Sequence, residues 1–353
     1  MGSITASFLS EKNLHPRAQE IFLDAISRGW ADPGKIHRAS RELTRLLDES
    51  RQIFANHLKI APNSIHFLGE PNLGFLLGIE GVRKYQSAAS IYFPATARQE
   101  VMALVAGRNN SQSLTVDLSG AWDVPVGSLT DLLVHPTVNL ETGAIAPSAE
   151  GFVGQIFVDA TADPMVGLPS NWSTALWDAK CWAGPVGLGI FAIRDDSQWL
   201  NPLPHLDHRK VPGGYNPALV IAAAVALEAT IADRINSEAE TSRLSSLIRR
   251  FIVDEIGDVD IASPDDGVPH LLSFSFLYLD AEQLVDQMER RGFSLDSGSA
   301  CISADLEPSH VLAAMGRLTH GNLRIDLSPD MTEETVVEML TQLNAVVKEL
   351  RAQ

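Results

Sequence analysis

Short apolar segments alternate with amphipathic ones along most of this 353-residue chain, and this alternation limits the possible folds more than any other feature of the sequence. Short apolar runs are typical of buried strands, and apolar residues at helical spacing are typical of amphipathic helices. The expected strands lie at 65–68, 90–93, 113–118, 131–135, 155–159, 175–180 and 189–193. The expected helices lie at 36–58, from 69 to about 85, and at 98–106. This order predicts an α/β fold with a mostly parallel sheet that is covered by helices on both faces.

The second part of the chain has a different pattern. Two helices are expected at 217–233 and 238–255. They are followed by strands at 271–279, 293–295 and 322–327, and by helices at 281–291, 309–315 and 332–351. This pattern predicts a smaller α+β unit. We therefore expect a large domain over residues 15–240 and a small domain over 241–353 that also includes residues 1–14.

Charge and cysteine content exclude several classes of protein. The net charge is −17, from 27 Lys and Arg against 44 Asp and Glu, so binding to nucleic acid is not expected. Two cysteines cannot form a disulfide framework, which favours a reducing compartment. The N-terminus has no signal-like pattern, and the longest apolar run, 218–227, is too short to span a bilayer. We expect a cytoplasmic protein that does not bind membranes, and no metal site, because His205 and His208 lack convincing ligand spacing.

Cys301 lies in the run Ser-Gly-Ser-Ala-Cys at 297–301, between a strand-like and a helix-like segment. Small residues allow a loop to move and a substrate to approach the thiol closely. A single cysteine is more commonly a small buried hydrophobic residue. The loop alone therefore does not decide between the two interpretations.

Asp159 and Lys180 form a second candidate group. Asp159 ends an apolar strand, and Lys180 follows the next apolar strand, directly before a Gly- and Pro-rich turn. An Asp for a pyridinium nitrogen and a Lys for a Schiff base are two fixed needs of pyridoxal phosphate chemistry. A lysine in apolar surroundings would also be desolvated, which lowers its pKa. Taken singly, each residue is more often a turn Asp or a surface Lys.

Together these residues resemble the cysteine desulfurases, a class V aminotransferase-like family of fold-type-I pyridoxal phosphate enzymes. Residues 297–301 match the family's Ser-Gly-Ser-Ala-Cys loop in full. The other matches are the lysine motif (Lys180, Gly184, Pro185, Gly187, Gly189), the Val-Asp-Ala strand end (158–160), the Asn-Asn-Glu-Thr-Gly turn (Asn139 and 141–143), and the segments 309–312, 314–316 and 323–325. The resemblance covers nearly the whole chain. It implies the fold-type-I architecture, with a large domain and a smaller C-terminal one.

The resemblance also implies roles for individual residues. Lys180 would hold pyridoxal phosphate covalently and move protons, and Asp159 would contact the pyridine nitrogen. Asn139 would contact cofactor and substrate, and Arg324 would bind the carboxylate of L-cysteine. Cys301 would take the sulfur as a persulfide, with release of alanine, and pass it to an unidentified protein acceptor. A homodimer is also implied.

The chain departs from the family where the cofactor phosphate should bind. The family's Gly-Ala-Thr-Glu segment reads Gly-Glu-Pro-Asn at 69–72, so that Pro71 removes a hydroxyl and an N–H donor. Trp177 and Ala179 replace the Ser and His of the lysine motif, and Gly214 replaces a Thr. Phosphate binding depends on such donors and on helix N-terminal amides. The phosphate site is therefore expected to be degenerate.

Arg98 occupies the position of the histidine that stacks on the cofactor in the family. Its guanidinium group can stack on the ring or bind the phosphate from a new direction. Three functions remain open at this point. The first is a divergent pyridoxal phosphate-dependent cysteine desulfurase, the second a cofactor-poor, non-catalytic homologue that acts as a binding partner, and the third another class V lyase or aminotransferase.

Overall fold

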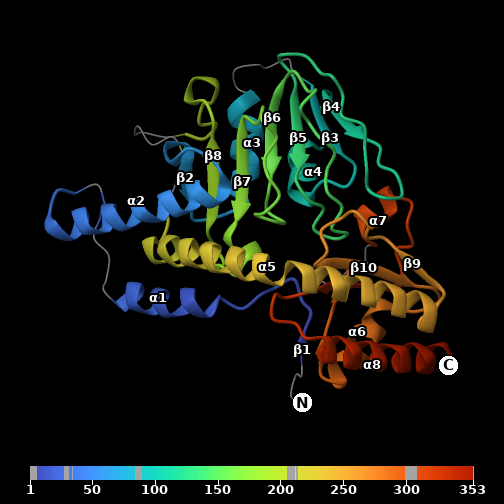
Figure 1. Cartoon of the computed structure of the whole chain (residues 1–353). Coiled ribbons are helices and arrows are strands. Elements are labelled where there is room, and N and C mark those ends of the chain that lie inside the picture. The colour runs from blue at the N-terminus through green and yellow to red at the C-terminus, as the bar shows by residue number, and fades with distance from the viewer. Residues whose placement is uncertain are drawn as a thin grey trace.

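The computed structural model describes residues 6–27, 32–33, 35–83, 90–204, 211, 214–298 and 308–352. Cys301, His205 and His208 lie outside these residues, so the expectations about them stay predictions. The described part contains a large and a smaller sheet, each with its own apolar core. Figure 1 shows the large sheet beside the C-terminal elements, with α5 running along both.

The large sheet confirms the predicted mostly parallel α/β architecture. Its seven strands follow the order β2 (Ile65–Leu68), β8 (Gly189–Ile193), β7 (Thr174–Asp178), β6 (Gln155–Asp159), β5 (Leu132–Pro136), β3 (Ile91–Pro94) and β4 (Ser111–Leu114). The strands from β7 to β4 are parallel, whereas β8 is antiparallel to both of its neighbours. Because β8 is antiparallel to both β2 and β7, these two strands run in the same direction.

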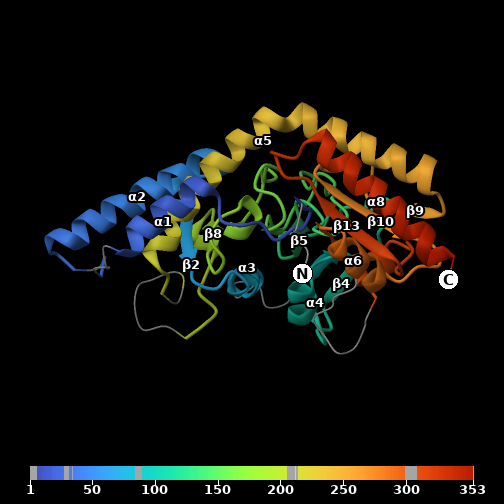
Figure 2. The ribbon, with the colours of Figure 1, turned by 90° about the horizontal axis from the view of Figure 1, so that it is seen from below.

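Helices cover both faces of this sheet, as expected for strands that are apolar on both sides. On one face lie α1 (Pro16–Ser27), α2 (Arg38–Leu58) and α5 (Pro217–Phe251), and on the other α3 (Leu73–Arg83) and α4 (Gln99–Val105) (Figure 2). Alternate residues of β6 separate accordingly: Ile156 and Val158 belong to the core under α2 and α5, and Phe157 to the core under α3. A period of two residues produces this division.

The smaller sheet is antiparallel and consists of β12 (Asp296–Ser297), β13 (Asn322–Asp326), β10 (Leu271–Phe276) and β9 (Val259–Ile261). The helices of this unit are α6 (Ala281–Arg290), α7 (His310–Ala314) and α8 (Glu333–Arg351). At the N-terminus, β1 (Ala6–Ser7) pairs in parallel with β11 (Phe293–Ser294). The domain boundary expected at residue 240 falls inside α5, and it stays a prediction.

Several predicted elements differ from the structure. The two helices expected at 217–233 and 238–255 are one 35-residue helix, α5, which continues into a π-helical turn at Ile252–Ile256. The residues between the two expected helices include neither Gly nor Pro, and the helix passes through them. The strand expected at 175–180 ends at Asp178, and Lys180 lies in a 3-10 turn at Ala179–Trp182. The strand expected at 113–118 is β4, at Ser111–Leu114, and helix α1 and strand β9 were not predicted.

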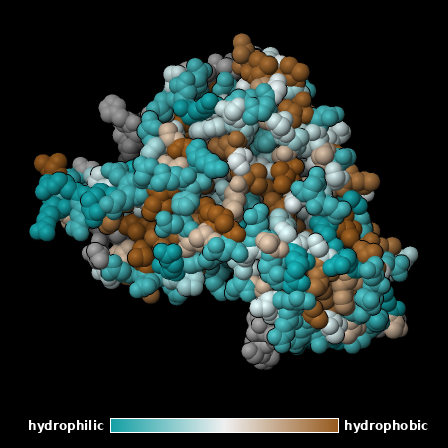
Figure 3. All heavy atoms as spheres, viewed as in Figure 1, coloured by the Kyte–Doolittle hydropathy of each residue, from teal (hydrophilic) through white to brown (hydrophobic). Residues whose placement is uncertain are grey.

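The surface in Figure 3 is mixed, with hydrophobic groups separated by hydrophilic ones. The exposed large apolar side chains of α1 are Ile21, Leu23 and Ile26. No helix among the described residues has both the length and the apolar composition that a membrane span requires. The same residues contain no cluster of three or more His, Cys, Asp or Glu side chains that could hold a metal ion.

A buried charged cluster joins α5 to both sheets. The guanidinium group of Arg234 donates to both carboxylate oxygens of Asp163, at 2.9 and 2.7 Å, and Asp163 follows β6. The imidazole Nδ1 of His270 lies 3.2 Å from Arg234 Nη2, next to β10. Only 1% of the Asp163 side chain is exposed. Two-point pairing of this kind offsets the desolvation of the buried carboxylate.

His270 makes stability depend on pH. Burial, together with the charge of Arg234, lowers the pKa of His270 from 6.5 to about 3. The unfolded chain therefore binds one more proton than the folded chain between these values, so the stability that His270 contributes above pH 6.5 is lost progressively as the pH falls towards 3. We expect the free energy of unfolding to fall less between pH 7 and pH 5 in His270→Gln than in the unchanged protein. Urea unfolding at both pH values checks this, and equal pH dependence in the two proteins would contradict it.

Candidate active site

Two carboxylates end neighbouring parallel strands of the large sheet. Asp159 is the last residue of β6 and pairs in register with Leu176 of β7, and Asp178 is the last residue of β7. Both side chains are buried. Lys180 follows two residues after Asp178. The carboxyl edge of a parallel sheet is where ligands bind in α/β proteins, so these residues mark the candidate site.

Lys180 is held at the start of its turn by Asp178. The Asp178 carboxylate accepts a hydrogen bond from the backbone N–H of Lys180 at 3.1 Å, and its other oxygen lies 3.6 Å from Lys180 Nζ. The lysine side chain is 51% exposed, so the expectation of a desolvated lysine is wrong for this chain. Trp177 and Trp182 are fully buried in the core under α2 and α5, where Trp182 Nε1 donates to the carbonyl oxygen of Ala223. The amine is therefore accessible and paired with one carboxylate.

Asp159 is buried and hydrogen bonded to the segment that follows it. Its Oδ1 accepts from the backbone N–H of Thr161 at 3.1 Å and from the Thr161 hydroxyl at 2.6 Å. Burial raises the pKa of Asp159 above that of an ordinary aspartate, and the charge of Arg98 and the Thr161 hydrogen bonds offset part of this effect. The structure thus places a buried carboxylate at the carboxyl end of β6.

Arg98 lies next to Asp159. Its Nη1 donates to the Thr161 hydroxyl at 2.9 Å, and Nε and Nη2 donate to the Glu100 carboxylate at 3.2 and 3.1 Å. The guanidinium carbon lies 5.5 Å from the centre of the Phe75 ring. Burial alone would lower the pKa of Arg98, but the charges of Asp159 and Glu100 outweigh it and raise the pKa. Arg98 therefore belongs to the Asp159 end of the site.

The side chain of Asn139 accepts hydrogen bonds within the turn that it begins. Its Oδ1 accepts from the backbone N–H groups of Glu141 and Thr142, at 2.9 and 3.0 Å, and from the Thr142 hydroxyl at 3.2 Å. Its Nδ2 donates to the carbonyl oxygen of Thr96 at 3.3 Å. Asn139 thereby joins this turn to the loop that carries Arg98. Its role toward a cofactor or substrate stays a prediction.

Arg324 lies in the smaller sheet, on β13. Its Nη2 donates to the carbonyl oxygen of Ser297 at 2.9 Å. Its Nε is buried and has no hydrogen-bond partner within the described part of the chain. A buried cationic donor without a partner is costly, and a carboxylate would satisfy it. No direct hydrogen bond or ion pair between described residues joins Arg324 to Lys180 or Asp159, so the structure does not bring all the predicted residues into direct contact.

Two hydrogen bonds made by side chains of the smaller unit connect it to the candidate site, and the sequence did not predict them. The Ser309 hydroxyl, at the start of α7, donates to the Glu141 carboxylate at 2.6 Å. His310 Nε2 lies 2.8 Å from the carbonyl oxygen of Ala97. The sequence also assigned no role to Thr161 or Glu100. Ser309 and Glu141 occur in segments that match the family's motifs, and this match was the only sequence signal that could have pointed to their contact.

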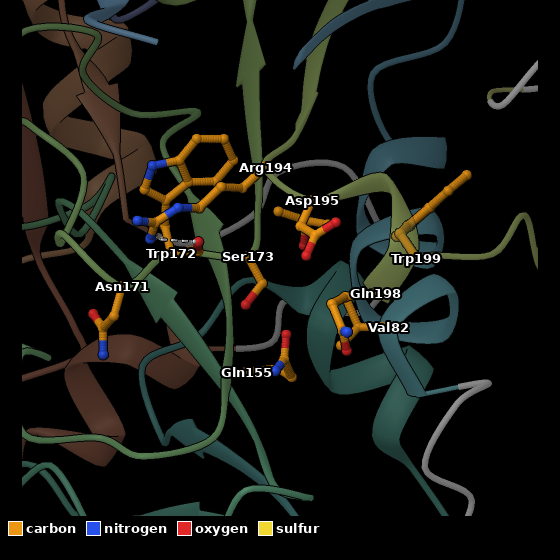
Figure 4. Close-up of a pocket in the computed structure, with 10 residues that line it drawn as sticks. Val82, Gln155, Asn171, Trp172, Ser173, Arg194, Asp195, Gln198 and Trp199 are labelled. Carbon is orange, nitrogen blue, oxygen red and sulfur yellow. Dashed lines mark hydrogen bonds between the residues drawn. The ribbon is translucent and has the colours of Figure 1, made fainter. Parts of the chain in front are cut away.

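Two other features, Cys181 and a small surface cavity, are weaker candidates for a functional site. Burial raises the pKa of the Cys181 thiol well above its ordinary value, so this cysteine is a packed thiol and a poor nucleophile at neutral pH. A small cavity of about 190 Å³ opens at the opposite edge of the sheet, near the first residues of β6 and β7. Figure 4 shows Arg194 folded against Trp172 in this cavity. The Arg194 guanidinium donates to the carbonyl oxygen of Trp172 at 3.3 Å, which ties it to the local backbone.

The architecture is that of the fold-type-I pyridoxal phosphate enzymes. A solved NifS-like protein matches 98% of this chain and 99% of its own, with a TM-score of 0.85 and 20% identity. The solved structure of SspA in complex with cysteine matches 93% of this chain and 100% of its own, with a TM-score of 0.73 and 20% identity.

Sequence comparison shows which members of this structural class the chain resembles. No model of a known protein family matches the chain. The cysteine desulfurase IscS of Dictyoglomus turgidum is 26% identical to this chain over an alignment of 370 positions. The alignment covers 96% of this chain and 93% of that protein. The chain is thus similar to curated cysteine desulfurases over nearly its whole length.

Proposed function

We propose that this protein is a divergent cysteine desulfurase. It would remove sulfur from L-cysteine in the site between β6, β7 and β13, and would transfer it to Cys301. The observation that carries the proposal is the placement of Asp159 and Lys180 at the carboxyl ends of neighbouring parallel strands. The family's cofactor is pyridoxal phosphate, and a buried carboxylate and an accessible amine that follow neighbouring strands suit the ring of that molecule.

Each described residue has a defined task in this proposal. The pyridoxal ring, when bound, supplies an electron sink for the substrate's α-carbon. Asp159 would hold the ring nitrogen and stabilise its positive charge. Lys180 Nζ would hold the cofactor through its aldehyde group and would move a proton at the substrate's α-carbon. Arg324 binds the substrate carboxylate and orients the substrate.

Sulfur transfer requires a nucleophile, and the sequence offers Cys301 for it. The Cys301 thiolate would attack the substrate sulfur, the carbon–sulfur bond would break, and a persulfide would form on Cys301. The substrate's β-carbon would take up a proton and leave as part of alanine. We further propose a cytoplasmic homodimer and an unidentified protein that accepts the sulfur. The resemblance to the family and the low cysteine content support this part.

The proposal is tested by supplying the purified protein with L-cysteine and either pyridoxal phosphate or pyridoxal at high concentration. We expect alanine and sulfide in equal amounts, in the presence of a reductant that releases the persulfide sulfur. Alanine that forms equally well in Cys301→Ser would instead favour another class V lyase or aminotransferase. No alanine and no lysine-bound chromophore would favour the non-catalytic homologue.

Arg324→Gln should raise the KM for L-cysteine by about 10- to 100-fold, because a charged hydrogen bond to a carboxylate contributes about 1.5–3 kcal/mol. The kcat should change less, because the carboxylate is distant from the bond that breaks. Arg290→Gln on α6, which removes an exposed ion pair with Asp286, is the matched control and should leave KM unchanged. Steady-state alanine formation measures both constants. An unchanged KM in Arg324→Gln would exclude the assigned role.

A further inference from the structure

The start of α3 lies at the same edge of the sheet as the candidate site. Leu68, the last residue of β2, and Asp178, the last residue of β7, both pair in register with Gly189 of β8. Pro71 lies directly over Gly189, since its Cα is 3.0 Å from the position of a Cβ at residue 189. The segment between β2 and α3 is therefore only one strand away from the turn that carries Lys180.

A helix N-terminus at such a position is a common binding site for a phosphate, because its first amides have no partners within the helix. In α3 the corresponding amides already have partners. Pro71 has no N–H. The donors and their acceptors are Asn72 N–H to Glu70 Oε1 at 3.1 Å, Leu73 N–H to Glu70 O at 3.2 Å, Gly74 N–H to Pro71 O at 2.8 Å, and Phe75 N–H to Asn72 O at 3.2 Å.

A cationic group near this helix start is Arg98, whose guanidinium carbon lies 5.5 Å from the centre of the Phe75 ring in the first turn of α3, but it already donates to Thr161 and Glu100. The other groups named at this helix start are acceptors or apolar side chains. The Glu70 carboxylate accepts a hydrogen bond from the backbone N–H of Asn72, and the carbonyl oxygen of Gly214 lies against Gly69, where a Cβ would meet it. Ala179, beside Lys180, is buried and offers no side-chain donor. The described residues thus fit the ring of the cofactor at Asp159 and Lys180, but they do not fit its phosphate at α3.

We propose that Glu70 occupies the subsite of the cofactor's 5′-phosphate, so that this site binds the pyridoxal ring and discriminates against the phosphorylated form. The inference rests on the proposed function, because it concerns the same ring site. A phosphate dianion would have to displace Glu70 from Asn72 N–H and would meet its negative charge at short range. Unphosphorylated pyridoxal carries no such charge and meets neither obstacle.

The test compares how pyridoxal phosphate and pyridoxal label Lys180. Each aldehyde is titrated against the protein, the product is reduced with cyanoborohydride, and the labelled Lys180 peptide is quantified by mass spectrometry. Both values are normalised to the reaction of each aldehyde with free Nα-acetyl-lysine, because pyridoxal closes to a hemiacetal. Glu70→Ala is the test variant, and Glu338→Ala, at an exposed position of α8, is the matched control.

We expect the unchanged protein and Glu338→Ala to be labelled by pyridoxal at least as readily as by pyridoxal phosphate. In Glu70→Ala, labelling by the phosphate form should improve by about tenfold or more, because a backbone amide becomes free and a like charge is removed, while labelling by pyridoxal stays the same. Glu70→Gln keeps a side-chain acceptor for Asn72 N–H and should change in the same direction, which covers the case in which Glu70→Ala weakens α3.

A tenfold or greater preference of the unchanged protein for pyridoxal phosphate would overturn the inference and leave the proposed function intact. The same holds for a ratio that both Glu70 variants leave unchanged. Labelling of Lys180 by neither aldehyde in any variant would overturn the proposed function and the inference together. The two failures are therefore distinguishable.

Discussion

Lys180→Ala is expected to abolish the formation of alanine from L-cysteine, with a fall in rate of at least about 10²- to 10⁴-fold. The reason is the position of the Lys180 amine and its ability to react with an aldehyde. Lys180 has an accessible amine at the carboxyl edge of the sheet, and Asp178 holds its backbone and pairs with its side chain. Alanine quantified by chromatography over a range of cysteine concentrations measures the effect.

Two further variants serve as controls for the loss of activity in Lys180→Ala. Lys348→Ala, on α8, removes an exposed lysine of the smaller unit and should leave the rate unchanged. Lys180→Arg keeps a positive charge beside Asp178 but cannot bind an aldehyde, so it should be as inactive as Lys180→Ala. Activity in Lys180→Arg would show that the lysine supplies only charge, which would contradict its proposed role.

Arg234→Met is expected to cause the largest loss of stability among single substitutions in the buried charged cluster, about 3–5 kcal/mol. The substitution leaves the Asp163 carboxylate buried without the two hydrogen bonds that now satisfy it. Methionine has a similar length, so packing along α5 should change little. Urea unfolding at pH 7 measures the difference.

The matched control lies on the same helix. Arg243 pairs with Glu240 and Glu333, but all three side chains are about half exposed, so Arg243→Met should change stability little. The double variant Arg234→Met with Asp163→Asn should recover part of the loss, because the uncompensated charge is then absent. Equal losses in Arg234→Met and Arg243→Met would contradict the assignment of a buried, stabilising pair.

The sequence pattern predicted much of the fold because the strands are apolar on both faces and short. The strands β2, β6 and β8 begin and end at the predicted residues. The prediction failed where local composition was ambiguous. The pattern predicted two helices in place of α5, yet tertiary packing against α1 and α2 at one end and the smaller sheet at the other supports one long helix.

The residue types of the site could also be predicted, but not their surroundings. Asp159 is the last residue of a predicted strand, and the structure confirms that it is buried at the strand end. Lys180 is half exposed instead of desolvated, although Ala179 and Trp182 of the same 3-10 turn are buried. The contacts of Glu141 with Ser309 and of Ala97 with His310 join residues far apart in the chain, and no local pattern encodes such pairs.

The sequence by itself determined the α/β class and the resemblance to the cysteine desulfurases, and it predicted Lys180, Asp159 and Arg324 as site residues, because periodicity and motif spacing are local properties. Only the tertiary structure decided which charges meet. It placed Arg98 beside Asp159 through Thr161, and it turned the Glu70 side chain onto the first amide of α3. The physical reason is that electrostatic effects depend on distance and burial, and both are set by how strands and helices pack, not by their order in the chain.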